Sequence, residues 1–244
     1  MIKQVIFKKI KFNNFEDYDF KKIISKKGYF VFPAAPALAS INLSKNYYDA
    51  LLKADSVFFD SGFFVLLLKL IKGITVKKFS GYKFLSLFFD HLKNNKTTSI
   101  LTIDPNKINS IANKKLLKEI GVKRVDSYIA PNYDQESLRD LKLLKRIKKT
   151  KPDFIITNIG GGIQEILGKY IKEKSNKKCT IVCTGGAIAF FTGKQAPINS
   201  LIDKLYLGWF LRLIFNPIIF IKRYISALKL IKMVLKDNIR IVKI

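Results

Sequence analysis

The chain has 244 residues and 48% apolar content, enough for one large domain, or one domain with an appendage, around a buried core. Its formal net charge of +27 indicates an anionic partner: a nucleic acid, anionic lipid headgroups or a diphosphate-bearing substrate. Because only six of the 45 basic residues are arginine and lysine is spread along the chain, composition disfavours a nucleic-acid-binding protein.

The N-terminal stretch Met1–Phe7 is short and mixed and soon meets Lys8 and Lys9, so no signal peptide is expected. The longest weakly charged stretch, Leu205–Ile221, contains an arginine, an asparagine and a proline. We therefore expect it to be interfacial or buried rather than membrane-spanning. The protein is expected to begin in the cytoplasm.

Apolar runs alternate with longer amphipathic segments from about residue 28, which predicts an α/β fold with a mainly parallel sheet. The expected strands are Tyr29–Phe32, Ser56–Phe59, Thr98–Ile103, Arg124–Ile129, Phe154–Asn158 and Cys179–Cys183. The expected helices include Ser40–Ala54, Pro105–Ile120 and the basic Gln135–Lys149.

Asp60 ends an apolar strand and precedes Ser61 and a glycine, so it is a candidate general base; its alternative role is to cap the next helix. His91 closes an expected helix, where a favourable interaction with the helix C-terminus accounts for it. Cys179 and Cys183 share one face of a strand, which predicts reduced, structural thiols rather than metal ligands.

Two glycine turns follow expected strands. Gly160, Gly161 and Gly162 open a helix, so their amides could approach phosphate oxygens, although the full dinucleotide fingerprint is absent and a simple tight turn is an equal interpretation. Gln164, in the first helical turn, could bind a ligand or complement the helix start. The second turn, at Gly185, would lie at the same carboxyl edge, where open α/β folds bind ligands.

After residue 200 the sequence becomes aromatic and contains arginines. Arg212 and Arg223 could hold a diphosphate with directed donors, or extend along an apolar surface. The final helix is expected to be basic on one side and apolar on the other, and either to dock on the core or to lie in an anionic bilayer surface. The basic side comprises Lys222, Ser226, Lys229, Lys232 and Lys236; the apolar side comprises Tyr224, Leu228, Ile231 and Leu235.

The only D-x-D triplet, Asp17-Tyr18-Asp19, lies in a charged segment expected to precede the main sheet, so metal binding there is not expected.

Several segments, in order and spacing, resemble the WecG/TagA/CpsF glycosyltransferase family from about residue 28 to 225. They are A-D-S-V-F-F-D-S-G at 54–62, K-F-S-G at 78–81, P-D-F-I-I-T-N-I-G-G-G-I-Q-E at 152–165, G-G-A-I-A-F-F-T-G at 185–193, L-G-W-F-L-R at 207–212, N-P at 216–217 and R-Y at 223–224.

The resemblance implies inverting transfer of an N-acetylhexosamine-type sugar from a UDP donor to a polyprenyl-diphosphate-linked sugar in surface polysaccharide synthesis, without a metal or other cofactor. It implies a Rossmann-like core, residues 1–206, and a membrane-proximal appendage, residues 207–244, at the cytoplasmic face of the cell membrane. An anionic membrane surface is an expected partner and nucleic acid is not. The oligomeric state stays open, a homo-oligomer included.

At the matching positions, the resemblance implies that Asp60 is the proposed general base and that Gln164 belongs to the donor site. Arg212 and Arg223 resemble diphosphate-binding arginines, and Lys78 stands where an arginine is usual.

Two departures from the family pattern leave the substrate open. Pro33-Ala34-Ala35-Pro36 replaces a Thr-x-Asn-Pro sequence, and D-S-G replaces D-G-x-G. The competing interpretations are an NAD(P)-dependent oxidoreductase that uses the same glycine turns, and a basic nucleic-acid-binding protein.

Overall fold

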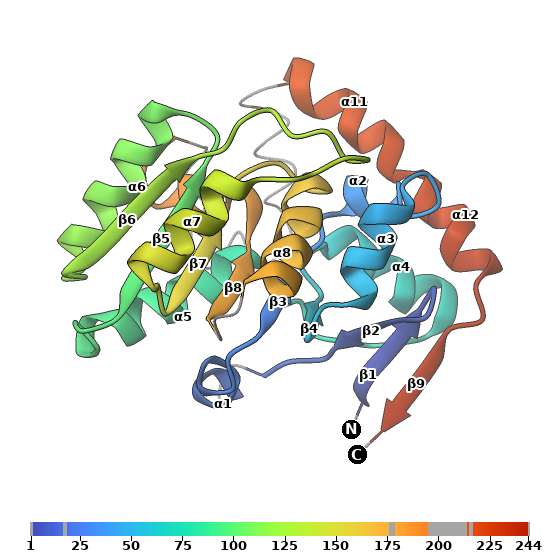
Figure 1. The fold of residues 1–244 in the computed structure, drawn as a ribbon. Coiled ribbons are helices and arrows are strands. Elements are labelled where there is room, and N and C mark those ends of the chain that lie inside the picture. The colour runs from blue at the N-terminus through green and yellow to red at the C-terminus, as the bar shows by residue number, and fades with distance from the viewer. Residues whose placement is uncertain (1, 17–18, 176–178, 195–213, 215–216, 244) are drawn as a thin grey trace.

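The computed structural model describes residues 2–16, 19–175, 179–194, 214 and 217–243. Within these residues nine strands form one sheet in the order β6-β5-β7-β8-β3-β4-β2-β1-β9 (Figure 1). Neighbouring strands from β6 to β2 are parallel, and β1 is antiparallel to both β2 and β9. This mainly parallel sheet, flanked by helices and followed by a C-terminal helical piece, confirms the predicted fold class.

The strands are β1 (Ile2–Phe7), β2 (Ile10–Asn13), β3 (Tyr29–Val31), β4 (Ser56–Phe58), β5 (Ser99–Asp104), β6 (Arg124–Ile129), β7 (Phe154–Thr157), β8 (Thr180–Cys183) and β9 (Arg240–Lys243). All six strands expected from the sequence form, each within one residue of its predicted ends.

The expectation that the N-terminal segment precedes the main sheet was wrong. Strands β1 and β2 form a hairpin, and β2 pairs with β4. Lys8 and Lys9 both have positive φ, 50° and 63°, as the two-residue turn of a twisted hairpin requires. The two lysines that interrupted the apolar pattern are therefore the hairpin turn.

The helices are α1 (Phe20–Ser25), α2 (Ala35–Leu38), α3 (Lys45–Leu52), α4 (Gly62–Lys72), α5 (Gly81–Asn94), α6 (Lys107–Glu119), α7 (Leu141–Thr150), α8 (Ile163–Lys174), α11 (Pro217–Ala227) and α12 (Lys229–Lys236), with the 3-10 helix η2 (Gly185–Phe190). Helices α3, α4, α7, α8 and α12 pack on one side of the sheet, and α1, α5 and α6 pack on the other (Figure 1).

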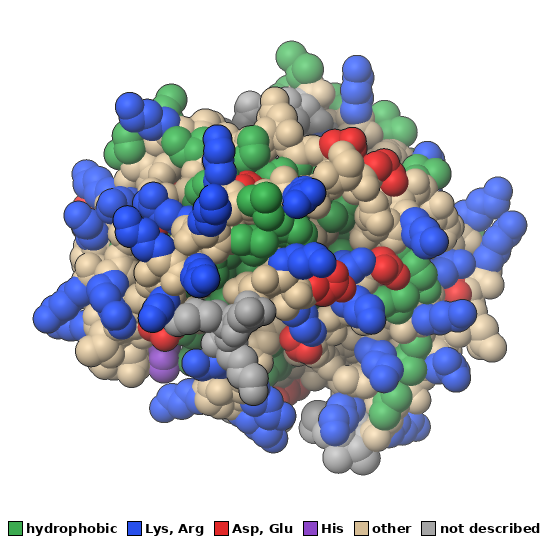
Figure 2. Space-filling model, viewed as in Figure 1, with side chains coloured by type: hydrophobic (Ala, Val, Ile, Leu, Met, Phe, Trp, Pro, Cys, Tyr) green, Lys and Arg blue, Asp and Glu red, His purple; other side chains and the backbone are tan. Residues whose placement is uncertain are grey.

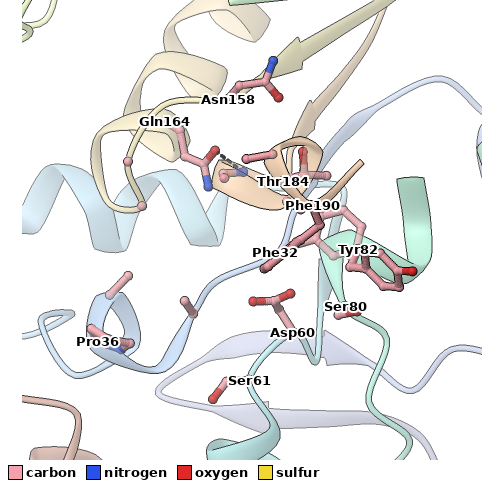
Figure 3. A pocket seen from close by; sticks show the side chains of 18 of the residues that line it. Phe32, Pro36, Asp60, Ser61, Ser80, Tyr82, Asn158, Gln164, Thr184 and Phe190 are labelled. Carbon is pink, nitrogen blue, oxygen red and sulfur yellow. Dashed lines mark hydrogen bonds between the residues drawn. The ribbon is translucent and has the colours of Figure 1, made fainter. Parts of the chain in front are cut away.

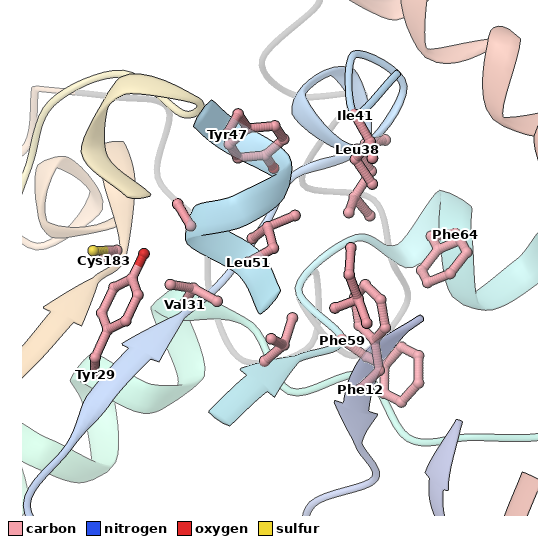
Figure 4. Close-up of a cluster of buried hydrophobic side chains, with 14 of the residues drawn as sticks. Phe12, Tyr29, Val31, Leu38, Ile41, Tyr47, Leu51, Phe59, Phe64 and Cys183 are labelled. Atoms are coloured by element: carbon pink, nitrogen blue, oxygen red, sulfur yellow. The ribbon is translucent and has the colours of Figure 1, made fainter. Parts of the chain in front are cut away.

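Alternating side chains divide the core between the two faces of the sheet. In β3, Tyr29 and Val31 join the cluster under α3 and α8, whereas Phe30 joins the phenylalanine-rich cluster under α5. Figure 4 shows the first of these clusters, which also contains Cys183. Cys179 and Cys183 are free and buried in this same cluster, as their spacing predicted.

Two of the three expected helices begin at least five residues later than the sequence predicted, because a polar side chain caps each start. Helix α7 begins at Leu141, after Asp140 accepts a hydrogen bond from the Leu143 amide at 2.8 Å. Helix α3 begins at Lys45, after Ser44 accepts one from the Tyr47 amide. The first amides of a helix have no carbonyl partner within the helix, and a capping side chain accepts a hydrogen bond from one of them.

The expected final helix is divided at Leu228 into α11 and α12. The predicted apolar side is not the packed one: Ala227, Leu230 and Val234 are buried, whereas Leu228 and Leu235 are more than half exposed. Helix α12 packs beside α4 and α11 beside α2 (Figure 1). The division into residues 1–206 and 207–244 stays a prediction, and residues 195–213 lie outside the described part.

Candidate active site

A cavity of about 600 Å³ opens at the carboxyl edge of the sheet. Its walls come from the residues that follow β3, β4, β5, β7 and β8, and from α11. Segments that are far apart in sequence therefore meet at the edge where open α/β folds bind ligands.

The cavity brings together most of the residues that the sequence singled out. Its lining includes Asp60, Lys78, Gly160, Gly161, Gln164, Gly185 and Arg223. Gly162 is at the start of α8, outside that lining, and Arg212 lies outside the described residues.

Asp60 follows β4 and its carboxylate faces the cavity (Figure 3). Its Oδ1 accepts a hydrogen bond from the Gly81 amide at 2.8 Å, at the N-terminus of α5. Capping of α4 falls instead to Ser61, whose Oγ accepts from the Phe64 amide at 3.1 Å. Asp60 is thus not the helix cap, and the carboxylate is held at the cavity wall by an amide of another helix.

Gln164 connects the two glycine turns. Its Oε1 accepts from the Gly185 amide at 2.8 Å and from Thr157 Oγ1 at 3.2 Å. Its Nε2 donates to Glu165 Oε1 at 3.0 Å and to the Cys183 carbonyl at 3.4 Å. Because both lone pairs and both hydrogens have protein partners, Gln164 fixes the second turn against the first.

Glu165 is fully buried behind the first turn and closes the start of α8. Its Oε2 accepts from the Gly162 amide at 2.6 Å, so that amide is already occupied by the protein. Burial is the main cause that raises the pKa of Glu165 to about 7, and the charge of Asp60 adds to the rise. The two carboxylates are therefore electrostatically coupled across the wall.

Three segments bring positive charge to the cavity. Lys78 precedes α5, Lys194 follows η2, and Arg223 reaches the lining from α11. A cationic wall favours an anionic ligand, and an arginine can hold phosphate oxygens with two directed donors. Lys194 was not predicted, since it falls in no motif.

The wall after β3 is apolar. Ala34, Ala35 and Pro36 line the cavity there. Phe32 and Tyr82 add aromatic surface, and Tyr82 stacks on Phe191 with ring centroids 4.9 Å apart.

The sequence analysis also missed several uncharged polar residues of the lining, among them Asn158 and Thr184. Asn158 and Thr184 directly follow β7 and β8, and both are nearly buried. Asn158 Oδ1 and Thr184 Oγ1 have no hydrogen-bond partner among the described residues. Their place immediately after two apolar strands was the signal that could have identified them.

An open, mainly parallel sheet with a cationic cavity and two glycine turns at its carboxyl edge defines a Rossmann-like α/β protein with a site for an anionic ligand. The sequence profile of the glycosyl transferase WecG/TagA/CpsF family matches residues 2–243. The chain belongs to this family and is a glycosyltransferase of polysaccharide synthesis. A search of curated proteins found no match.

Proposed function

We propose that the protein is an inverting glycosyltransferase that moves an N-acetylhexosamine-type sugar from a UDP donor to a polyprenyl-diphosphate-linked sugar. The observation that carries the proposal is a carboxylate, Asp60, held in the same cavity as Lys78, Arg223 and the glycine turn at Gly160. This arrangement suits a reaction that needs a base for a hydroxyl and positive charge for a leaving diphosphate.

Asp60 is the proposed general base. It removes the proton from an acceptor hydroxyl as that oxygen bonds to the anomeric carbon of the donor sugar. The bond between the anomeric carbon and the diphosphate oxygen breaks on the opposite side, so the configuration inverts and UDP leaves. The Gly81 amide, which donates to Asp60 Oδ1, keeps the carboxylate oriented for this step.

The departing diphosphate gains negative charge as its bond breaks. Lys78 and Arg223 line the cavity and supply positive charge, and the proposed role of Arg212 is the same. Such charges lower the barrier most when they are already positioned in a partly closed cavity. We propose that these residues stabilise the leaving group without a metal ion.

The acceptor is proposed to enter from an anionic membrane surface at the cytoplasmic face. Helix α11 contributes Arg223 and Tyr224 to the cavity and exposes Ile218, Ile221 and Ile225 on its outer side. Figure 2 shows hydrophobic side chains along the upper rim, where α11 runs, next to Lys and Arg side chains. Exposed apolar and basic side chains together suit binding to an anionic bilayer surface.

None of the described helices is long and apolar enough to cross a membrane.

The test is a transfer assay with a panel of radiolabelled nucleotide sugars and a polyprenyl-diphosphate-linked acceptor sugar. The expected result is transfer from a UDP-N-acetylhexosamine, with the opposite anomeric configuration in the product, measured by NMR spectroscopy. Transfer from a sugar on another nucleotide only, or a product with retained configuration, would contradict the proposal.

A further inference from the structure

A buried polar network lies behind the cavity at the end of β5. Asp104 is fully buried and accepts hydrogen bonds from Thr102 Oγ1, Asn113 Nδ2 and Asn158 Nδ2, each at 2.7 Å. A carboxylate attracts the amide nitrogen of Asn158 and repels its oxygen. The network therefore fixes which end of the Asn158 amide faces away from Asp104.

The oxygen that Asn158 turns away from Asp104 has no partner. Asn158 lines the cavity and is 6% exposed, and its Oδ1 accepts no hydrogen bond from the described residues. Buried hydrogen-bond acceptors in proteins nearly always have a partner, because an acceptor that loses its bound water and gains no other donor destabilises the protein. A ligand that brings an N–H or O–H group to this atom would satisfy it.

The place of Asn158 in the sheet indicates which part of a donor would reach it. The chain leaves β5 for β6 on one side and returns to β7 on the other, so Asn158 lies at a topological switch point. Asp60 follows β4, three strands away from β7, which corresponds to about 14 Å at the usual spacing of strands. Figure 3 shows the two residues at opposite ends of the cavity.

The second glycine turn, at Gly185, lies between those ends because it follows β8, whereas the first, at Gly160, follows β7 and so lies on the same side as Asn158. If the reacting sugar lies at Asp60 and the diphosphate at the second glycine turn, the remaining end of a nucleotide sugar extends to Asn158. That end is the nucleobase.

We propose that Asn158, held by Asp104, recognises the donor's nucleobase by accepting a hydrogen bond from a ring N–H such as the N3–H of uracil. This inference rests on the proposed function, because it requires a nucleotide donor in the cavity. Cytosine carries a lone pair at the same ring position. Asn158 cannot turn its amide to meet that lone pair, since Nδ2 is bound to Asp104. Asn158 and Asp104 together therefore select uracil over cytosine.

Calorimetric binding of UDP, CDP and N3-methylated UDP to the full chain tests this selection. The wild-type protein is expected to bind UDP at least about tenfold more tightly than the other two, the usual effect of one unsatisfied buried acceptor. Asn158→Leu, which has similar size but no acceptor, is expected to bind UDP about tenfold more weakly and to lose the preference.

The matched control is Asn94→Leu, at an exposed position near the end of α5, which should keep the wild-type preference. Asp104→Asn tests the positioning role of Asp104 while keeping size and the potential to accept a hydrogen bond. It is expected to reduce the ratio of UDP to CDP affinity more than it reduces total nucleotide binding, because Asn158 is then free to turn.

If the ratio of UDP affinity to CDP affinity were equal in the wild type and in a folded Asn158→Leu protein, the inference would be overturned and the proposed function would stand. Failure of the wild type to bind any of the three nucleotides would overturn both. Thermal melting of each variant establishes that a lost preference does not come from unfolding.

Discussion

Among single residues, Glu165 connects the cavity wall to the stability of the fold. Its carboxyl group is fully buried, and the Gly162 amide and Gln164 Nε2 donate to it. Burial outweighs these hydrogen bonds and raises its pKa to about 7 from an ordinary 4.5. The folded protein therefore binds a proton at Glu165 more readily than the unfolded chain does.

The raised pKa of Glu165 predicts how the stability of the protein depends on pH. The stabilisation linked to the raised pKa is fully present below about pH 4.5 and is lost as pH rises through about 7. Between about pH 5.5 and 8.5, the free energy of unfolding should fall by about 2 kcal/mol from this group. Urea unfolding across that range measures it.

Glu165→Gln provides the comparison, because glutamine does not titrate. The variant is expected to be less stable at low pH but to change less with pH. His91, whose pKa is lowered chiefly by burial, has an opposite effect that both proteins share. Parallel stability curves for the two proteins would show that Glu165 does not titrate in this range.

At the scale of elements, α8 lies unusually close to the sheet at Gly168. A Cβ atom at this position would lie 2.5 Å from Tyr29 Cε2 and 2.9 Å from Cys183 Sγ. Tyr29 is itself fixed, because its hydroxyl donates to the Glu165 carbonyl at 2.6 Å. The contact between α8 and β3 thus supports the helix whose start forms the first glycine turn.

Gly168→Ala is expected to destabilise the protein by about 1 to 3 kcal/mol, because the added methyl group overpacks this contact. A loss of stability would be diagnostic of overpacking, since alanine usually stabilises the middle of a helix relative to glycine. Gly160→Ala is the control for stability, because its Cβ would meet no atom within 4 Å. Chemical denaturation measures both; an unchanged or increased stability of Gly168→Ala would refute the packing argument.

Helix α11 carries the proposed membrane contact. Replacing Ile218, Ile221 and Ile225 together by serine removes side chains that are 86%, 46% and 62% exposed. Binding to vesicles of anionic phospholipid is expected to weaken by about tenfold or more, because apolar area no longer enters the bilayer surface. Co-sedimentation measures the bound fraction.

The control replaces Ile108 and Ile111 of α6, which are 66% and 60% exposed, by serine. These changes remove about two thirds as much exposed isoleucine surface, at a different place in the fold. Equal loss of vesicle binding in both variants would mean that α11 is not the contact.

For the whole molecule, the sequence predicted the elements that rest on local apolar patterns. The six expected strands formed: five are almost entirely buried and read as largely apolar runs, whereas β6, at the edge of the sheet, is only partly buried. The hairpin of β1 and β2 was missed, since Lys8 and Lys9 resemble a break in the pattern although they form the turn.

Features that depend on distant residues could not be predicted. Asn158 and Asp104 are 54 residues apart, and only the pairing of β5 with β7 brings them together. A helical wheel placed Leu228 and Leu235 together on the apolar side of one continuous helix, whereas the structure divides that helix at Leu228 and leaves both side chains exposed. Asp60 and the glycine turns come together for a simpler reason: each follows a parallel strand at the same edge of the sheet.

The most direct test of the central claim, that Asp60 is the base of a glycosyltransferase, is the transfer rate of Asp60→Asn. Asparagine keeps an oxygen that can accept from the Gly81 amide, so the fold and UDP binding should be retained. Asp90→Asn, at an exposed position of α5 where the carboxylate pairs with Lys93, is the control and should transfer normally. The account predicts a loss of about a hundredfold or more for Asp60→Asn alone; a wild-type rate in that variant would contradict it.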